Sequence, residues 1–320
     1  MNKTGAKWSC MKNGVSSINE NNVEIDRISS LHDDVLTHIL SFLSTKESVQ
    51  TCILSKRWKD TWATVPVLDI KHNDFLVYGH DCGGDHNKVL RISAARCERF
   101  MTGFLDNRAP TKLDRVCCMR RNFEVDASIG WLDRVALLRP LLMDIFISST
   151  NLIDMPDLVF SCSNMQHLSM TVYTGINNTI IRPVSINLPS LKFLELTWIK
   201  LHEDFAQKLF MGCPSLERLK LHHCDLYFSD ICSEMLKELT LEGCYMWEQM
   251  QISCPALISL NMLINLEGVG ISLKNMSSVA DVVIKLYEYV SDDVPVLNLF
   301  GGLSNVTNLE LELTIDVFKV

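Results

Sequence analysis

The strongest constraint on the fold is a short apolar motif that recurs along most of the chain. The motif reads Leu-x-x-Leu-x-Leu, with Met, Ile or Val allowed at each apolar position, and successive copies begin 20 to 29 residues apart. Nine copies begin at Leu113, Leu142, Met165, Leu191, Leu216, Leu236, Leu257, Val279 and Val306, and residues 65–70 form an earlier one. One such match arises easily by chance. Nine matches in near-register predict one supersecondary unit that is stacked repeatedly into a solenoid.

The better copies carry more of the pattern of a leucine-rich repeat, in which the first, fourth and sixth positions are buried. The ninth position is Cys224 in one copy, Cys244 in the next and Asn265 in the one after. A side chain at this position is expected to satisfy backbone groups in the turn that follows the strand. The intervals then correspond to one coil of the solenoid for each copy.

The segments between the copies predict the second layer. Residues 203–210 carry apolar side chains at i, i+4 spacing, and Gly212 and Pro214 stop the pattern. We expect a return helix there, on the convex side. The predicted fold class is therefore α/β, with a parallel β-sheet on the concave face of the solenoid.

A different periodicity precedes the repeats, in residues 25–65. Asp33 and Asp34 place negative charge where a helix start favours it. The apolar residues behind them spread over a broad helical face and are Val35, Leu36, Ile39, Leu40 and Leu43. Thr45 is expected to cap a second helix and Ser55 a third. Residues 25–65 are thus predicted to form three helices.

These three helices carry more apolar surface than they can bury against one another. The third would carry Trp58 and Trp62 on one face. Three helices within about forty residues bury their own apolar surface poorly. We do not expect Leu36, Leu40 and Leu43 all to point inward. The surplus apolar surface predicts an interface that a partner completes.

The same residues carry a resemblance to a known family. The segments are IDRISSLHDDVL (25–36), ILSFL (39–43), TKE (45–47) and LSKRW (54–58). Together they resemble an F-box, and the match is closest to plant F-box proteins whose box is followed by leucine-rich repeats. That family usually has proline after the first leucine of the box, where this chain has His32. The resemblance implies a three-helix F-box that docks on a Skp-type adaptor of an SCF-type cullin-RING ubiquitin ligase, while the repeats bind an unknown protein target.

The resemblance and the apolar pattern together give a set of adaptor-binding residues and a division into domains. The adaptor-binding residues are Leu31, Leu36, Ile39, Leu40, Leu43, Val49, Leu54 and Trp58. The predicted domains are a disordered tail (1–24), the F-box (25–65) and the solenoid (66–320). Apolar residues continue to Val320 without a polar cap, so we expect the coil from Val306 to be covered by a partner or to fray.

A second surface follows from the repeat register. The third, fifth and seventh residues of each copy point away from the core, onto the concave face. The residues nominated there for target binding are Phe193, Glu195, Arg218, Lys220, His222, Glu238 and Glu242. Parallel strands lie about 4.8 Å apart, so Arg218 would face Glu238 and His222 would face Glu242. The row is either a self-paired charge ladder or a target-binding patch with a basic stripe between acidic ones.

Composition argues against several other classes of protein. A net charge of −8 disfavours nucleic acid as a general partner, and no segment is apolar enough to span a membrane. Twelve cysteines without an apparent secretory signal predict free thiols and a cytoplasmic or nuclear location. Cys162, Cys213 and Cys254 each precede a copy by three residues, as buried repeat positions would. We therefore expect no catalytic residues and no enzyme activity.

Residues 80–86 contain metal-binding residue types but lack paired cysteines, so we interpret them as a linker and expect no metal or cofactor. Three alternatives to the ligase subunit stay open. One is a small-molecule sensor that uses the concave face, which would need a deep pocket with convergent polar groups. Another is an F-box protein that acts outside a ligase complex. A third, less favoured, is an enzyme that acts through cysteine chemistry.

Overall fold

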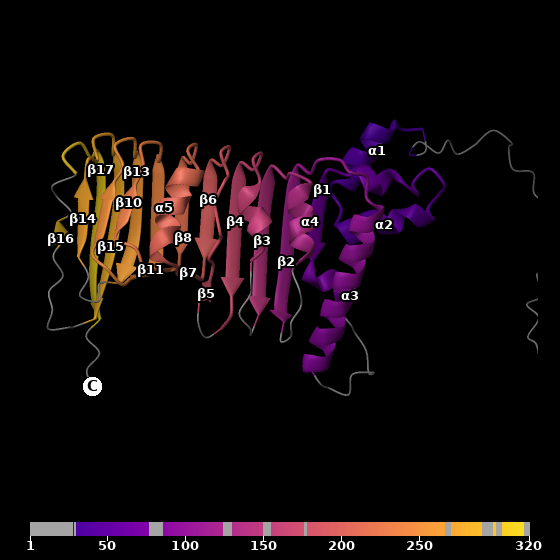
Figure 1. Cartoon of the computed structure of the whole chain (residues 1–320), viewed down its shortest axis with the longest axis horizontal. Coiled ribbons are helices and arrows are strands. Elements are labelled where there is room, and N and C mark those ends of the chain that lie inside the picture. The colour runs from indigo at the N-terminus through magenta and orange to yellow at the C-terminus, as the bar shows by residue number, and fades with distance from the viewer. Residues whose placement is uncertain are drawn as a thin grey trace, which may run out of the picture.

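The structure is a computed structural model of the 320-residue chain. It describes residues 28, 30–76, 86–123, 130–149, 155–175, 178–265, 270–289, 297–298 and 303–316. Short helices gather at the N-terminal end of an elongated ladder of strands (Figure 1). The ladder is the solenoid that the repeat pattern predicts.

Every copy of the motif contributes one strand to a single parallel sheet. In spatial order the strands are β1 (Val67–Lys71), β2 (Arg115–Phe123), β3 (Leu142–Ser149), β4 (His167–Tyr173), β6 (Phe193–Thr197), β8 (Arg218–His222), β11 (Glu238–Met246), β13 (Ser259–Asn265), β15 (Asp281–Tyr289) and β17 (Asn308–Asp316). Spatial order follows chain order throughout, so each coil packs only against its two neighbours. This confirms the predicted α/β solenoid.

One of the nine frames is wrong by two residues. Arg115 of β2 pairs with Leu142 of β3, so Leu113 aligns with Pro140 and the copy begins there. Pro140 is buried, whereas Leu142 is exposed. The pattern missed this start because proline was not allowed at the first position. Proline is tolerated there because its missing N–H lies before the strand and outside the ladder.

The opposite side of the sheet is covered by helices in the first coils and by a second sheet in the later ones. The helices are α3 (His86–Asn107), α4 (Trp131–Leu137) and α5 (Glu203–Gly212), with 3-10 turns at His72–Phe75 and Asp157–Ser161. The second sheet is β10 (Asp230–Cys232), β12 (Met250–Ser253), β14 (Ile271–Lys274) and β16 (Leu297–Asn298). Three short strands, β5 (Thr179–Ile180), β7 (Ile199–Leu201) and β9 (Asp225–Leu226), follow the main strands of their coils. They pair with one another in this order, and β9 also pairs with the end of β11. Helix α5 is the return helix predicted at 203–210.

The core is one continuous stripe of the first, fourth and sixth repeat positions. In the coil of β8 these are Leu216, Leu219 and Leu221, all buried. The ninth-position cysteines are buried as well. The Cys224 thiol donates to the Leu196 carbonyl across 3.4 Å, and the Cys244 thiol to the Leu221 carbonyl across 3.3 Å. Both acceptors lie in the strand of the preceding coil, β6 or β8, and not in the turn that follows, so the cysteines bond backbone groups at a different place from the predicted one. The side chain of Asn265 lies outside the described residues.

The N-terminal helices differ from the sequence prediction in two respects. They are α1 (Asp33–Leu40) and α2 (Thr45–Gln50), followed by 3-10 turns at Thr51–Ile53 and Thr61–Thr64. Ser44, not Thr45, caps α2. Its hydroxyl accepts from the Glu47 N–H across 3.4 Å, and Glu47 accepts from the Ser44 N–H across 2.9 Å, a capping box.

No third α-helix forms among the described residues of this region. Turns at 56–60 lead into the 3-10 turn instead, so Ser55 caps nothing. Trp62 donates its ring N–H to the Lys59 carbonyl across 2.8 Å and packs against both the helical core and the solenoid core. Its ring lies 5.5 Å from that of Phe104 on α3. The contacts of Trp62 with both cores therefore outweigh the helical periodicity of the segment.

Candidate functional site

The described helices have a core of their own, and most of the predicted adaptor-binding residues belong to a core. Leu36, Leu40 and Trp58 are buried together with Val65. Leu31 and Leu43 pack against the same cluster, and Val49 packs against the solenoid core. The expectation that Leu36, Leu40 and Leu43 could not all point inward is therefore wrong. The segment that leads into β1 supplies Trp58 and Val65, which complete a core that three helices alone could not close.

The apolar residues left outside this core form a row along α1. Val35, Ile39 and Phe42 stand at i, i+4 and i+7, and all three are exposed, Phe42 by 75%. We call these three residues the α1 row. Ile53 (84% exposed) ends the 3-10 turn that follows α2, and Leu54 (65% exposed) comes directly after it. Of the predicted set, only Ile39 and Leu54 are exposed. Val35, Phe42 and Ile53 were missed, although the i, i+4, i+7 spacing of the α1 row is visible in the sequence.

The start of α1 is held without the proline that the resemblance would favour. His32 is the N-cap residue, and its Nδ1 accepts from the Asp34 N–H across 3.4 Å. Arg57 donates to the Leu31 carbonyl and to Asp33 Oδ1, the latter across 2.8 Å. Two side chains thus replace the rigidity of a proline ring, and the α1 row is presented on an anchored helix.

The second candidate surface is the open face of the main sheet, on the side away from α4 and α5. Strand register places Arg218 beside Glu238 and His222 beside Glu242, as predicted. His222 bridges two carboxylates: its Nδ1 lies 3.0 Å from Glu242 Oε2, and its Nε2 lies 3.4 Å from Glu195 Oε1. The ladder interpretation therefore describes His222, whereas the structure contains no ion pair between Arg218 and Glu238.

Phe193 is covered, although it lies at an outward position. Its side chain is 7% exposed, and the ring of His167 stacks on it at 4.4 Å. The Arg218 guanidinium and the Lys220 amine lie 5.1 Å and 5.7 Å from the ring centre. Phe193 thus supports two cations and does not itself present a contact surface.

The thiols of the core have the properties of packing groups. Burial raises the pKa of Cys213 to about 12 and the pKa of Cys162 and Cys254 to about 11. A thiol with such a pKa holds almost no thiolate near neutral pH, so these cysteines are poor nucleophiles. Among the described residues, no three His, Cys, Asp or Glu side chains gather as a metal site. Of the 80–86 stretch, residues 80–85 lie outside the described part, as does the side chain of residue 86.

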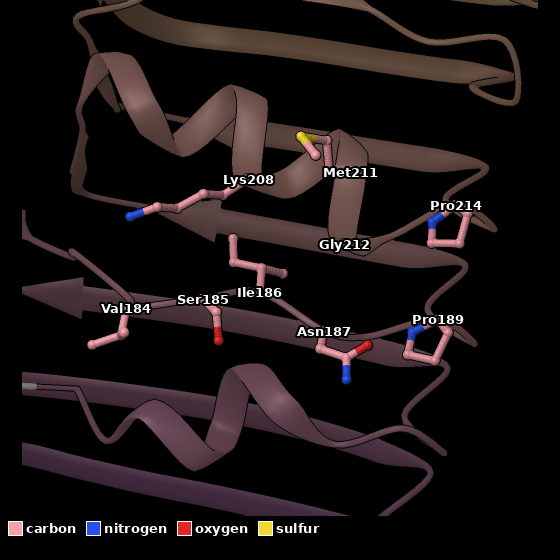
Figure 2. Close-up of a pocket in the computed structure, with 9 residues that line it drawn as sticks. All are labelled: Val184, Ser185, Ile186, Asn187, Pro189, Lys208, Met211, Gly212 and Pro214. Carbon is pink, nitrogen blue, oxygen red and sulfur yellow. The ribbon is translucent and has the colours of Figure 1, made fainter.

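A pocket of about 430 Å³ lies on the helical side of the sheet, between α5 and the segment 184–189 (Figure 2). Its floor requires Gly212, because a Cβ there would lie 2.0 Å from the Ile186 carbonyl oxygen. Its one charged lining residue, Lys208, already pairs with Asp204 at 2.8 Å and donates to the Pro183 carbonyl at 3.1 Å. Its charged lining residue is therefore engaged, and the other polar residues at the pocket are Ser185 and Asn187.

Comparison with known protein families agrees with this architecture. Residues 28–69 match the F-box domain. Residues 130–315 match the family described as FBD-associated F-box protein At5g56370, LRR repeats. The chain belongs to the plant F-box/LRR family. Both halves of the resemblance found in the sequence are thereby confirmed.

Individual relatives of this F-box/LRR protein come from Arabidopsis thaliana. Putative F-box/LRR-repeat protein At5g41840 is 28% identical over 309 residues, covering 84% of this chain and 52% of the relative. F-box protein At1g60400 is 30% identical and covers 73% of this chain and 56% of the relative. F-box/FBD/LRR-repeat protein At2g26030 is 31% identical and covers 60% and 40%. The chain thus spans about half the length of these relatives.

In this F-box/LRR protein the two candidate surfaces lie on different structural units. The α1 row belongs to the F-box, and the charged residues of the open face belong to the repeats. None of the described helices is long and apolar enough to cross a membrane.

Proposed function

We propose that this F-box/LRR protein is the substrate-recognition subunit of an SCF-type cullin-RING ubiquitin ligase. The F-box would dock on a Skp-type adaptor, and the repeats would bind the target protein. The observation that carries the proposal is the α1 row, a line of exposed apolar side chains on a domain whose own core is already complete. The subunit would perform no bond chemistry itself. It would raise the local concentration of target lysines near the ubiquitin-conjugating enzyme.

The α1 row suits such an interface in both chemistry and position. Exposure of large apolar side chains to water is unfavourable, and clusters of such side chains on a surface mark protein interfaces. Phe42 is the largest and most exposed member of the row. An aromatic side chain of this kind typically becomes an interface anchor when a partner provides a pocket for it. Leu36 and Leu40 contribute indirectly, because they are buried in the F-box core and hold α1 in place.

The proposal keeps the domain limits of the sequence: a tail at 1–24, the F-box at 25–65 and the solenoid at 66–320. It also keeps a cytoplasmic or nuclear location and a protein target, with neither nucleic acid nor membrane as a partner. The pocket beside α5 lies on the helical side of the sheet, so a small-molecule sensor that uses the concave face stays an alternative. Binding of the adaptor without the cullin would favour an F-box protein that acts outside a ligase complex.

The test is co-purification of the adaptor with the chain carrying Phe42→Glu. Placing a charge on the most exposed side chain of the α1 row should reduce adaptor recovery at least tenfold while the melting temperature stays within a few degrees. Met211→Glu is the matched control, because Met211 is an equally exposed apolar residue (76%) on α5 of the solenoid. Undiminished recovery with Phe42→Glu would refute the docking assignment. Leu40→Ala serves as a folding control, and we expect it to cost about 2–4 kcal/mol of F-box stability.

A further inference from the structure

Two cations on the open face are exceptions to the pairing seen elsewhere on that face. Arg115 pairs with Asp144 at 3.4 Å, Lys71 with Asp69 at 3.2 Å, and Lys285 with Glu310 at 2.8 Å. His167 and Arg115 lower the pKa of Asp144, and Glu310 and Glu312 raise the pKa of Lys285, as close ion pairs do. These cations are thus neutralised by carboxylates on the same strand or on a neighbouring one.

Arg218 and Lys220 do not follow this rule. Register sets Arg218 beside Glu238 and Lys220 beside Glu195. Yet neither cation has a carboxylate ion-pair partner among the described residues. Both lie over the covered ring of Phe193 instead, at 5.1 Å and 5.7 Å.

Around Lys220, two nearby carboxylates, Glu195 and Glu242, have other partners. Glu195 contacts His222 Nε2 through Oε1 at 3.4 Å and accepts from the Ser169 hydroxyl through Oε2 at 3.2 Å. Glu242 is held by His222 Nδ1 at 3.0 Å. The imidazole of His222 thus occupies two carboxylates that could otherwise turn towards Lys220. It acts as a positioning residue that keeps Lys220 available, while Arg218 is held over the ring of Phe193.

We propose that Arg218 and Lys220 bind a short acidic segment of the target protein, one that presents two carboxylates on alternate residues of an extended chain. The proposal rests on the proposed function for the origin of the segment. The binding itself is a property of the surface alone.

The geometry explains the spacing. Alternate residues on one side of a β-strand stand about 7 Å apart, which is also the spacing of alternate side chains in an extended peptide laid along β8. Arg218 can donate two parallel hydrogen bonds to one carboxylate, and Lys220 offers a point charge to the other. The ring of Phe193 restricts both side chains before binding, which lowers the entropy lost on binding.

The surrounding carboxylates add selectivity. Glu195, Glu238 and Glu242 flank the cation pair on the neighbouring strands. A long run of acidic residues or a polyanion would meet these glutamates, and like charges would oppose its binding. The site therefore favours a narrow segment with two acidic residues over a uniformly acidic one.

The direct test uses the whole chain and a fluorescein-labelled peptide of sequence Ala-Glu-Ala-Glu-Ala, followed by anisotropy. Changing Arg218 and Lys220 together to Ala should weaken binding at least tenfold. Lys285→Ala is the matched control, because it removes a cation from the same face that is already paired, and it should weaken binding less than twofold. The peptide with Gln in place of Glu should not bind. Equal binding of the Gln peptide, or an unchanged affinity in the double variant, would overturn the proposal.

A second set of variants tests the role of His222. His222→Ala should weaken peptide binding about threefold or more, because Glu195 and Glu242 become free to pair with the cations. Adding Glu195→Gln and Glu242→Gln to that variant should restore the affinity. Failure of this rescue would refute the positioning role.

Two further measurements separate this proposal from the proposed function. Arg218→Glu with Lys220→Glu should abolish target capture and leave adaptor co-purification unchanged. A lowered melting temperature with target capture intact would instead identify a purely structural ladder. Peptide binding that persists in Phe42→Glu, whose adaptor docking is tested separately, would show that the acidic-segment site stands even if the ligase assignment fails.

Discussion

The two ends of the solenoid have the same repeat pattern but differ in how far their apolar residues are buried. Leu68 on β1 and Leu309 on β17 both occupy the fourth position of their copies, yet Leu68 is 0% exposed and Leu309 is 48% exposed. Ile70 and Leu311, both at the sixth position, differ in the same way. A coil buries its apolar side only against its neighbours. Identical sequence patterns therefore give different burial according to what lies beside them.

The N-terminal end is closed by the F-box. The outer edge of β1 is met by α2, where the Asp69 N–H donates to the Thr45 hydroxyl across 2.8 Å. Trp62 belongs to the F-box core and to the solenoid core at once. The F-box thus caps the first coil in addition to carrying the α1 row. At the other end β17 pairs with β15, and no strand in the described part of the chain pairs with its outer edge.

The sharpest way to break this comparison is to truncate the matched leucines. Leu68→Ala should cost about 2–5 kcal/mol, because it leaves a cavity in a closed core. Leu309→Ala should cost about 1 kcal/mol or less, because half of that side chain already meets water. Urea unfolding followed by circular dichroism measures both changes. Equal costs would mean that the C-terminal coil is as well buried as the first.

Hydrogen exchange should resolve the same difference residue by residue. Amides of Leu309 to Leu313 should exchange at least about a hundredfold faster than those of Leu219 to Leu221 in the middle of the sheet, which is about 2.8 kcal/mol of opening free energy. The reason is that, among the described strands, only β15 pairs with β17. Similar strong protection at both places, in dilute protein, would contradict an open edge.

The hydrogen bond that closes the β1 edge can be removed alone. Thr45→Val keeps the side-chain shape but leaves the half-buried Asp69 N–H without its acceptor, so it should cost about 1–3 kcal/mol. Thr64→Val, at an exposed threonine in the same domain, is the control and should change little. If the two variants behaved alike, the contact between α2 and β1 would not contribute to the cap.

The smallest expected effect concerns the capping box that sets the start of α2. Ser44→Ala should cost about 0.5–2 kcal/mol. The Ser44 N–H lowers the pKa of Glu47 below its ordinary value. The stabilisation by Glu47 is therefore present above the ordinary glutamate pKa and is lost as the pH falls through the lowered one. The variant keeps the backbone N–H at position 44, so the unfolding free energies of both proteins, measured between pH 7 and pH 3, should fall towards the acid end, and a difference between them should remain there.

The sequence alone determined the periodic part of this protein. Apolar spacing located the strands, their parallel order and their buried positions, and the F-box segments located the N-terminal helices. It also located the buried cysteines Cys162, Cys213 and Cys254, because the same position of each coil has the same buried environment. These features depend on neighbours that are themselves copies of the same pattern, so one chain segment predicts the environment of the next.

Only the tertiary structure decided the features that depend on unlike neighbours. Leu36, Leu40 and Leu43 all point inward because the segment leading into β1 supplies Trp58 and Val65, which no helical periodicity reveals. His222 takes the carboxylates that register alone would offer to Lys220, because side chains compete for partners across three strands. Leu68 is buried because its coil is packed against the F-box, whereas Leu309 is exposed because no described element covers the last coil in this way. Periodicity tells which way a side chain points, whereas its burial and its partners depend on what the rest of the chain places there.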